Sequence, residues 1–438
     1  MFFGRASVTI GLVERDVTVG LKFLFGIIVR RGDLTIIDAS GALHKFGDGT
    51  GRGVTIRLAD KWVERKLTFN PSLYLGETYM DGGLTIEKGS LRDLIELLMA
   101  NLHRRWPAPL KFREKLRTVL RLIHQYNPAS RSRRNVAHHY DLDGALYELF
   151  LGPDRHYSCA YHQHPDMSLE EAQDAKMAHI AAKLDISDGQ RILDIGSGWG
   201  GLGLYLAGLG EVSVTGLTLS QEQLTISRQR AEREGMGDRV DFQLEDYRRF
   251  GGQAAAGKFD RIVSVGMFEH VGVGHYRRFF NKIDELLADD GVALLHSIGR
   301  FDGPGSTNPW LAKYIFPGGY VPALSEVVPV IERAGLYITD IEILRKHYAF
   351  TLKEWERRFQ AHRDKAAALF DERFCRMWEF YLIASELSFL YQDMMVFQIQ
   401  ITKSLHTLPL TRDYMFAWEA RHAPAPGRKN ESAPNSVN

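Results

Sequence analysis

Residues Arg191–Gly201, with the sequence RILDIGSGWGG, decide the fold of this chain. The segment begins as a short apolar run around a single acid, Asp194, which is the pattern of a buried parallel strand. The glycines that follow allow the backbone to turn tightly and to approach a ligand closely. The leucine-rich segment 202–209 is then predicted to be a helix. Strand, glycine turn and helix form the first unit of a doubly wound, Rossmann-like α/β domain that binds a nucleotide at the helix N-terminus.

The type of nucleotide is indicated by the segments that follow. The G-x-G-x-x-G dinucleotide pattern, which is weakly specific by itself, is satisfied by Gly196, Gly198 and Gly201. A nicotinamide site also needs an acid at the end of the second strand to bind the ribose. The second strand, VSVTGLTLS at 212–220, ends without an acid. Asp194, LEDY at 244–247 and the strand Phe259–Val265 fit an S-adenosylmethionine (SAM) domain better. Methyl transfer is therefore favoured over hydride transfer and over a glycine turn without a ligand.

Length and composition limit the remaining classes. The 438 residues allow two or three domains with sizeable cores. A net charge of +1 gives no reason to expect nucleic-acid binding. The two cysteines, Cys159 and Cys375, cannot form a disulfide framework, and no signal peptide is recognisable, so we expect a reducing cytoplasm. No apolar run is long enough to cross a bilayer, so any contact with lipid is expected at the membrane surface.

The chain divides into four parts by composition. Residues 1–100 are predicted to form a small α+β domain, with short strands from about 30 to 90, RKLTFN at 65–70 among them, and then a helix. Residues 101–134 are basic, with ten Lys or Arg against one acid. A solvated linker is the favoured interpretation of this segment alone, and a basic face on anionic lipid is the alternative. Residues 135–422 form the α/β domain, and the tail 423–438 is predicted to be disordered.

Within the α/β domain, Ser168 and Glu171 predict a capping box for a helix that leads into the glycine strand. That helix carries one apolar stripe, formed by Met177, Ile180, Ala181 and Leu184. Long helices are predicted to extend to about Ser404. Before them lies an insertion rich in aromatic residues, namely Phe301, Trp310, Tyr314, Phe316 and Tyr320.

Reactive side chains gather at or near the ends of the predicted strands. Tyr157 and Cys159 precede the glycine strand, Glu269 follows the strand at 259–265, and His296 ends the strand at 291–299. A lone imidazole or carboxylate is usually structural. Glu269 is harder to dismiss, because its sequence neighbours are apolar and a buried acid needs a partner or a function.

Six segments taken together resemble the cyclopropane-fatty-acyl-phospholipid synthase family, in one order and with compatible spacing from about Asn135 to Thr402. They are YSCAYH (157–162), LDIGSGWGGL (193–202), VTGLTLSQEQ (214–223), VSVGMFEHVG (263–272), LLHSIG (294–299) and NPWLAKYIFPGGYVP (308–322). GETYMDGGLTIE at 76–87 more loosely resembles the N-terminal lipid-binding domain of the family.

The resemblance implies a reaction and a set of site residues. The family transfers the SAM methyl group to the cis double bond of an unsaturated acyl chain in a phospholipid, and loss of a proton from the resulting carbocation closes a cyclopropane ring. Bound bicarbonate is the base, and no metal is implied. The residues implied to hold bicarbonate are Cys159, Glu269, His296, the backbone of Ile298, and Tyr348. The aromatic insertion would line an acyl tunnel, although core packing explains any one of its residues equally well.

The cofactor contacts follow from the same resemblance. SAM would contact Tyr157, Ser158, Asp194, Gly196, Ser197, Gly198, Trp199, Gly200, Gly201, Thr218, Gln223, Asp246 and Tyr247. The sequence departs from the family at Ser385, where many members carry a cysteine, so a covalent thiol mechanism at this position is not available.

The family also implies a homodimer and an enzyme that works at the inner membrane surface. Two alternatives stay open. The same carbocation can give a methyl-branched or methylene chain, and a decayed methyltransferase can bind lipid without catalysis.

Overall fold

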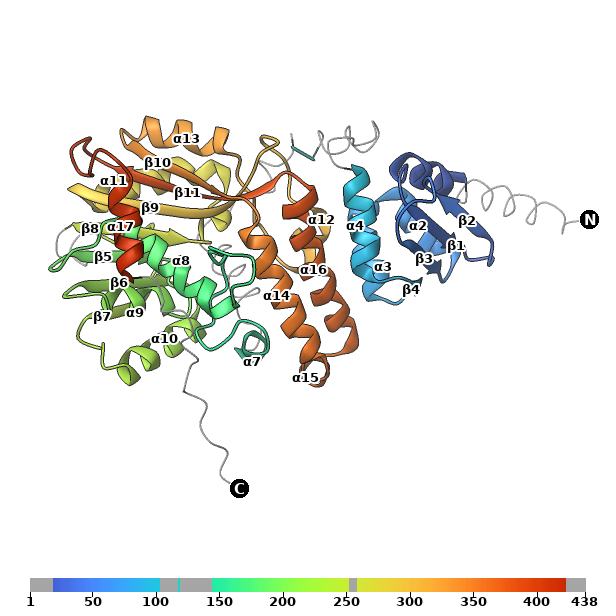
Figure 1. Cartoon of the computed structure of the whole chain (residues 1–438), viewed down its shortest axis with the longest axis horizontal. Helices are drawn as coiled ribbons and strands as arrows, with labels where there is room; N and C mark the ends of the chain where they lie inside the picture. Colours follow the sequence, from blue (N-terminus) through green and yellow to red (C-terminus); the bar gives the residue numbers. More distant parts are fainter. Residues whose placement is uncertain (1–18, 103–116, 119–143, 252–257, 423–438) are drawn as a thin grey trace, which may run out of the picture.

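The structure is a computed structural model that describes residues 19–102, 117–118, 144–251 and 258–422. A small N-terminal domain lies against one end of a larger α/β domain (Figure 1). The tail 423–438, and nine of the ten basic residues predicted in segment 101–134, lie outside the described residues. The tenth, Arg117, donates a 3.2 Å hydrogen bond from Nη2 to Asn70 Oδ1 of the N-terminal domain.

The N-terminal domain is a four-stranded sheet in the order β2-β1-β3-β4, with helices beside it. The strands are β1 (Asp33–Ile37), β2 (Leu43–Phe46), β3 (Gly53–Leu58) and β4 (Leu84–Lys88). The helices are residues 19–28, α2 (Lys61–Phe69), α3 (Pro71–Met80) and α4 (Leu91–Leu102). The predicted α+β class is therefore right for this domain.

The strand predicted at 65–70 is wrong, because most of this segment lies in α2. The Asp60 side chain accepts a 2.8 Å hydrogen bond from Val63 N and so begins the helix. Val63 and Leu67, four residues apart, are then buried on one helical face. Leu67 and Phe69 alternate with polar residues as in a strand, but in the helix Leu67 is buried and Phe69 is 73% exposed.

The α/β domain is built on a seven-stranded sheet in the order β10-β11-β9-β8-β5-β6-β7. The strands are β5 (Arg191–Ile195), β6 (Ser213–Thr218), β7 (Val240–Leu244), β8 (Phe259–Val265), β9 (Leu287–Arg300), β10 (Tyr337–Leu344) and β11 (Met394–Thr402). The five neighbouring strands β9, β8, β5, β6 and β7 are parallel to one another. Strand β11 is antiparallel to both β9 and β10. This is the predicted doubly wound architecture.

Strand β11 corrects the prediction that helices extend to Ser404. Helix α16 (Glu372–Tyr391) ends where Gln392 takes an extended conformation. The nine residues of β11 then run between β9 and β10, and all but Met394 are buried. Residues Phe397–Thr402 alternate apolar and polar side chains, which is typical of a strand, so this part of the sequence itself argues against a continued helix.

The remaining helices cover the sheet and form an extension toward the N-terminal domain (Figure 1). They are α7 (Gly144–Glu148), α8 (Leu169–Leu184), α9 (Gly201–Ala207), α10 (Gln221–Arg233), α11 (Tyr276–Leu286), α12 (Pro309–Tyr314), α13 (Leu324–Arg333), α14 (His347–Ala361), α15 (Arg363–Leu369) and α17 (Asp413–His422). The predicted capping box of α8 is confirmed: Ser168 N donates to Glu171 Oε2 at 2.9 Å, and Glu171 N donates to Ser168 Oγ at 3.2 Å. None of the described helices is long and apolar enough to span a membrane.

The N-terminal domain packs on α12 and α16. The Arg92 guanidinium of α4 makes two 2.7 Å hydrogen bonds to the Glu386 carboxylate of α16. Trp310 of α12 donates from Nε1 to Met80 Sδ at 3.2 Å. A Cβ at Gly76 would lie 2.4 Å from Trp310 Nε1, so only glycine fits here. The small domain thus contacts the aromatic insertion directly.

Candidate active site

The glycine turn after β5 forms the floor of a pocket. Gly196, Gly198 and Gly200 adopt φ values of 89°, 55° and 85°, which favour glycine. A Cβ at Gly196 would lie 2.8 Å from Met267 Cβ, and a Cβ at Gly201 would lie 2.6 Å from His156 Cε1. These close contacts leave no room for a side chain at either position. The bare backbone of the turn can therefore lie close to a ligand.

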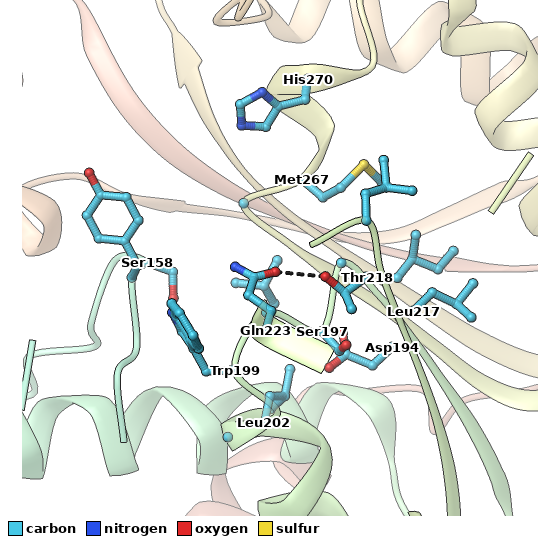
Figure 2. A pocket seen from close by; sticks show the side chains of 18 of the residues that line it. Ser158, Asp194, Ser197, Trp199, Leu202, Leu217, Thr218, Gln223, Met267 and His270 are labelled. Atoms are coloured by element: carbon cyan, nitrogen blue, oxygen red, sulfur yellow. Dashed lines mark hydrogen bonds between the residues drawn. The ribbon is translucent and has the colours of Figure 1, made fainter. Parts of the chain in front are cut away.

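The second strand supplies a polar pair in place of an acid. The Ser220 side chain caps α10 by accepting a hydrogen bond from Gln223 N. Thr218 Oγ1 donates to Gln223 Oε1 at 2.7 Å (Figure 2). Figure 2 shows this pair between Trp199 on one side and Met267 on the other.

All but one of the thirteen predicted cofactor contacts line this pocket. They are Tyr157, Ser158, Asp194, Gly196, Ser197, Gly198, Trp199, Gly201, Thr218, Gln223, Asp246 and Tyr247. The exception is Gly200, which faces inward: a Cβ there would lie 2.8 Å from the Phe242 ring and 2.9 Å from Ser227 Cβ. Gly200 acts through the shape of the turn.

Several buried polar atoms that line the pocket lack a hydrogen-bond partner. Asp194 Oδ2, Ser197 Oγ and Trp199 Nε1 are buried and have no hydrogen-bond partner within the described residues. Burial raises the pKa of Asp194 to about 7. Buried polar groups are normally satisfied, so these orphaned atoms indicate that a polar molecule binds here. The glycine cradle and this set of donors and acceptors fit a nucleoside with an amino-acid tail.

A second cluster surrounds Glu269, which lies between β8 and α11. Glu269 Oε1 accepts a 2.7 Å hydrogen bond from Ile298 N of β9, and Glu269 Oε2 is buried without a partner among the described residues. Burial raises the pKa of Glu269 to about 7, although the Ile298 N–H opposes that shift. The carboxyl group is thus near its titration point at neutral pH.

His296 lies two residues before Ile298 on the same face of β9. Gln398 Nε2 of β11 donates to His296 Nδ1 at 3.1 Å, which leaves the ring proton on Nε2. Burial lowers the pKa of His296 to about 3, with Lys176 the largest of the charges that add to the effect. His296 is therefore a neutral imidazole with one N–H to donate.

Cys159 and Tyr348 belong to one apolar cluster, and Ile298 packs against it. The Cys159 thiol donates to Ala160 O at 3.3 Å, and burial raises its pKa far above its usual range, so it stays protonated. The Tyr348 ring meets the Trp355 ring edge-on at 5.8 Å. Cys159, Glu269, His296, Ile298 and Tyr348, which we call the buried cage, thus come from four separate parts of the chain.

Comparisons with known proteins place this architecture in a family. Residues 128–399 match the family model of mycolic acid cyclopropane synthetases. The chain belongs to this family. It is 34% identical over 390 residues, 85% of this chain and 94% of the relative, to a probable fatty acid methyltransferase of Pseudomonas putida. It is 37% identical over 352 residues, 80% of this chain and 88% of the relative, to the cyclopropane-fatty-acyl-phospholipid synthase of Escherichia coli.

A solved structure supports the same assignment. The mycolic acid cyclopropane synthase CmaA1, in complex with SAH and CTAB, matches with a TM-score of 0.57 and 32% identity over 63% of this chain and 99% of that protein. This member of the cyclopropane synthetase family is therefore a SAM-dependent methyltransferase. Residues 34–105 match a separate domain family of unknown function.

Several residues of this methyltransferase site were missed by sequence reasoning. Lys176, His156 and Met267 all line the pocket, as does His270, which the sequence places with Glu269 after the strand at 259–265. Gln173, Lys176, His179 and Lys183 recur on α8 at three- and four-residue spacing, and all four are buried. This polar stripe lies beside the predicted apolar stripe, because Lys176 and Ile180 are four residues apart on the helix. A stripe of polar residues that borders the apolar face was the available signal.

The aromatic insertion divides into buried and exposed parts. Trp310 and Tyr320 are 1% and 2% exposed, whereas Phe301 is 58% exposed, which argues against a tunnel wall at Phe301. Tyr320 N donates to Glu269 O at 2.9 Å, so the insertion is attached to the buried cage. Ser385 lies half-buried on α16.

Proposed function

We propose that this methyltransferase adds the SAM methyl carbon to the cis double bond of unsaturated acyl chains in membrane phospholipids and forms cyclopropane rings. The observation that carries the proposal is the Glu269 carboxyl group. It is buried, has one oxygen without a described partner, and lies between Met267 and His270, which line the cofactor pocket. A buried carboxyl group that could hold a base for the final proton would thus lie next to the methyl donor, away from water.

The pocket residues would hold SAM, which supplies an electrophilic methyl group. The glycine turn after β5 would let the backbone lie close to the amino-acid part of the cofactor. Asp246 and Tyr247, which follow β7, would lie at its adenine end. The Thr218–Gln223 pair would take the role that an acid has in other nucleotide sites. The apolar walls around the buried cage would keep water away from a developing cation.

The buried cage fits bicarbonate, which would supply a base for the final proton. His296 offers one hydrogen-bond donor at neutral pH. The Cys159 thiol stays protonated, and it would have to turn away from Ala160 O to donate to the anion. The Ile298 amide is already bonded to Glu269, so Ile298 would act by orienting that carboxyl group. With a pKa near 7, Glu269 can be protonated and donate to an anion through its orphaned oxygen.

The test is product analysis with purified enzyme, SAM and vesicles of unsaturated phospholipid. Mass spectrometry and proton NMR of the released fatty acids distinguish a cyclopropane ring from a methyl-branched or methylene chain. A ring is the expected product. The sequence is 34% identical to a probable fatty acid methyltransferase, close to its 37% identity to the cyclopropane synthase, and this makes a branched chain the second candidate. If SAM binds but no modified lipid is formed, the alternative of a lipid-binding protein without catalysis is supported.

We propose in addition that the N-terminal domain brings the enzyme to the membrane surface. Trp62 and Phe69 of α2 and Phe23 of helix 19–28 are 60%, 73% and 64% exposed. Lys61, Arg65 and Lys66 lie on the same helix as the first two. Exposed aromatic side chains among cations suit an anionic bilayer.

Vesicle flotation tests this membrane proposal. Phe69→Ser should weaken binding to anionic vesicles, whereas the control Phe416→Ser, at a position 63% exposed on α17, should not. Equal binding of the wild-type protein to zwitterionic and anionic vesicles would contradict the charge argument. A homodimer stays a prediction.

A further inference from the structure

A buried lysine, Lys176 of α8, lies at one end of the cofactor pocket. The residue is 1% exposed. Its ammonium donates to Gln173 Oε1 at 2.7 Å and to Ser158 Oγ at 3.0 Å. Both acceptors are neutral, and no ion-pair partner of Lys176 is found in the described part of the chain. A buried cation without a counter-charge is costly, so the arrangement lacks a component.

The missing component would lie inside the pocket. Lys176 and Ser158 line it, and so does Asp194, whose Oδ2 has no described partner. Burial lowers the pKa of Lys176 to about 7 and raises that of Asp194 to about 7. Each charged form is therefore poorly stabilised by the protein alone, and each would gain from a ligand of the opposite charge.

We propose that Lys176, together with the Ser158 hydroxyl, binds the carboxylate of the amino-acid end of SAM. This inference rests on SAM occupying the pocket lined by the glycine turn. The amino-acid end is a zwitterion, so it brings a carboxylate for Lys176 and an ammonium for Asp194. The buried site then gains one positive and one negative partner, and its net charge does not change.

A purely structural role for Lys176 explains less. Gln173 already holds the backbone of the 156–158 loop, because its Nε2 donates to Ser158 O at 3.2 Å and to His156 O at 3.4 Å. Lys176 adds a bond to one hydroxyl, which a neutral donor could also make. Lys183, seven residues further along the same helix, is also buried, but it forms a 2.5 Å ion pair with Glu342. The chain thus pairs one buried lysine and leaves the other facing the pocket.

The experiment compares two ligands by calorimetry. S-adenosylhomocysteine (SAH) carries the carboxylate, and S-adenosyl-3-thiopropylamine is the same molecule without it. A charge-assisted hydrogen bond in a buried site predicts that the wild-type protein prefers SAH by roughly 10- to 100-fold. In Lys176→Met, the affinity for SAH should fall until the preference is about threefold or less, with the amine bound as tightly as by the wild type. The matched control, Lys183→Met, should keep the preference.

Three results would overturn the proposal. If Lys176→Met weakens both ligands equally, Lys176 acts by holding the loop. If it keeps the preference, the carboxylate is bound elsewhere. If the wild-type protein binds neither ligand, the cofactor assignment itself is wrong. Should Lys176→Met fail to fold, Lys176→Gln retains a donor for Ser158 without the charge and must still lose the preference.

Discussion

The cofactor pocket and the buried cage are adjacent but built differently. The pocket combines charged and polar groups, Lys176 and Asp194 among them, with apolar walls, and it comes mainly from the turns that follow successive strands. The buried cage is apolar around its few polar groups and gathers residues from 159 to 348. In the proposed function this difference would serve two tasks. The pocket would bind a charged cofactor, and the buried cage would keep water away from a reactive hydrocarbon centre.

Neighbouring residues of one segment serve the two regions. Ser158 lines the pocket, whereas Cys159 lies in the apolar cluster. Likewise Met267 and His270 line the pocket, and Glu269 between them bonds to Ile298. Binding and chemistry are thus separable by single substitutions, although the two regions share loops.

The largest expected effect is on turnover in Glu269→Gln. The amide cannot accept or transfer a proton as the carboxyl group does, so the rate on unsaturated phospholipid vesicles should fall by roughly 10²- to 10⁴-fold. SAH affinity, measured by calorimetry, should stay within about twofold, because Glu269 is outside the pocket lining. A parallel loss of SAH binding would show that the two regions are one unit.

The second prediction concerns stability and pH. The pKa of Glu269 is raised from 4.5 to about 7 in the folded protein. Below pH 4.5 the group is protonated in both states and contributes nothing. As pH rises to 7 and above, the unfolded chain releases this proton more readily, so the folded state loses about 3 kcal/mol.

The glutamine side chain of Glu269→Gln cannot titrate, so this variant should not lose that part of the free energy of unfolding as the pH rises. Urea unfolding of both proteins at pH 5 and pH 8 measures the difference, and subtraction removes other groups that titrate in the same range, Asp194 among them. The variant should gain stability relative to the wild type at pH 8. An equal pH dependence in both proteins would contradict the buried, proton-holding state of Glu269.

The third prediction perturbs the pocket alone. Gly196→Ala forces a Cβ to 2.8 Å from Met267 Cβ, a pocket residue, and should weaken SAH binding by roughly tenfold, or about 1.4 kcal/mol. Gly189→Ala is the matched control, because Gly189 also has a positive φ, 80°, but no atom within 4 Å of the added Cβ. Both variants bear similar backbone strain. Only Gly196→Ala should affect SAH, and an equal effect would attribute the loss to strain.

The smallest effect is expected at Ser385. A nucleophilic serine needs a base beside it, and the adjacent Glu386 is held by two hydrogen bonds to Arg92. Ser385→Ala should therefore keep its rate within about twofold and its stability within about 1 kcal/mol. Initial rates with folded protein matched between variants provide the test. A thousandfold loss with SAH binding intact would assign Ser385 to the chemistry.

The errors of sequence-based prediction have different origins. The short alternation in RKLTFN favoured a strand, but the Asp60 cap and the packing of Val63 and Leu67 make the segment helical. The alternation from Phe397 to Thr402 was a strand signal that was not used. The polar stripe of α8 was missed because Lys176 looks like a solvent-exposed residue until the 156–158 loop is seen to cover it. The backbone of Ile298 was expected to help hold an anion; its N–H donates to Glu269 in the structure, and the expectation stays a prediction.

Residue patterns alone were enough to predict the glycine turn with its flanking strand and helix, the capping box of α8, and the cofactor class. These features depend on residues close in the chain, and glycine spacing and apolar runs record them directly. Long-range packing was needed to show that β11 joins β9 to β10, that the small domain packs on Trp310, and that Lys176 and Asp194 face one pocket without pairing. These facts depend on burial and on contacts between segments far apart in the chain, and no local pattern of residues encodes them.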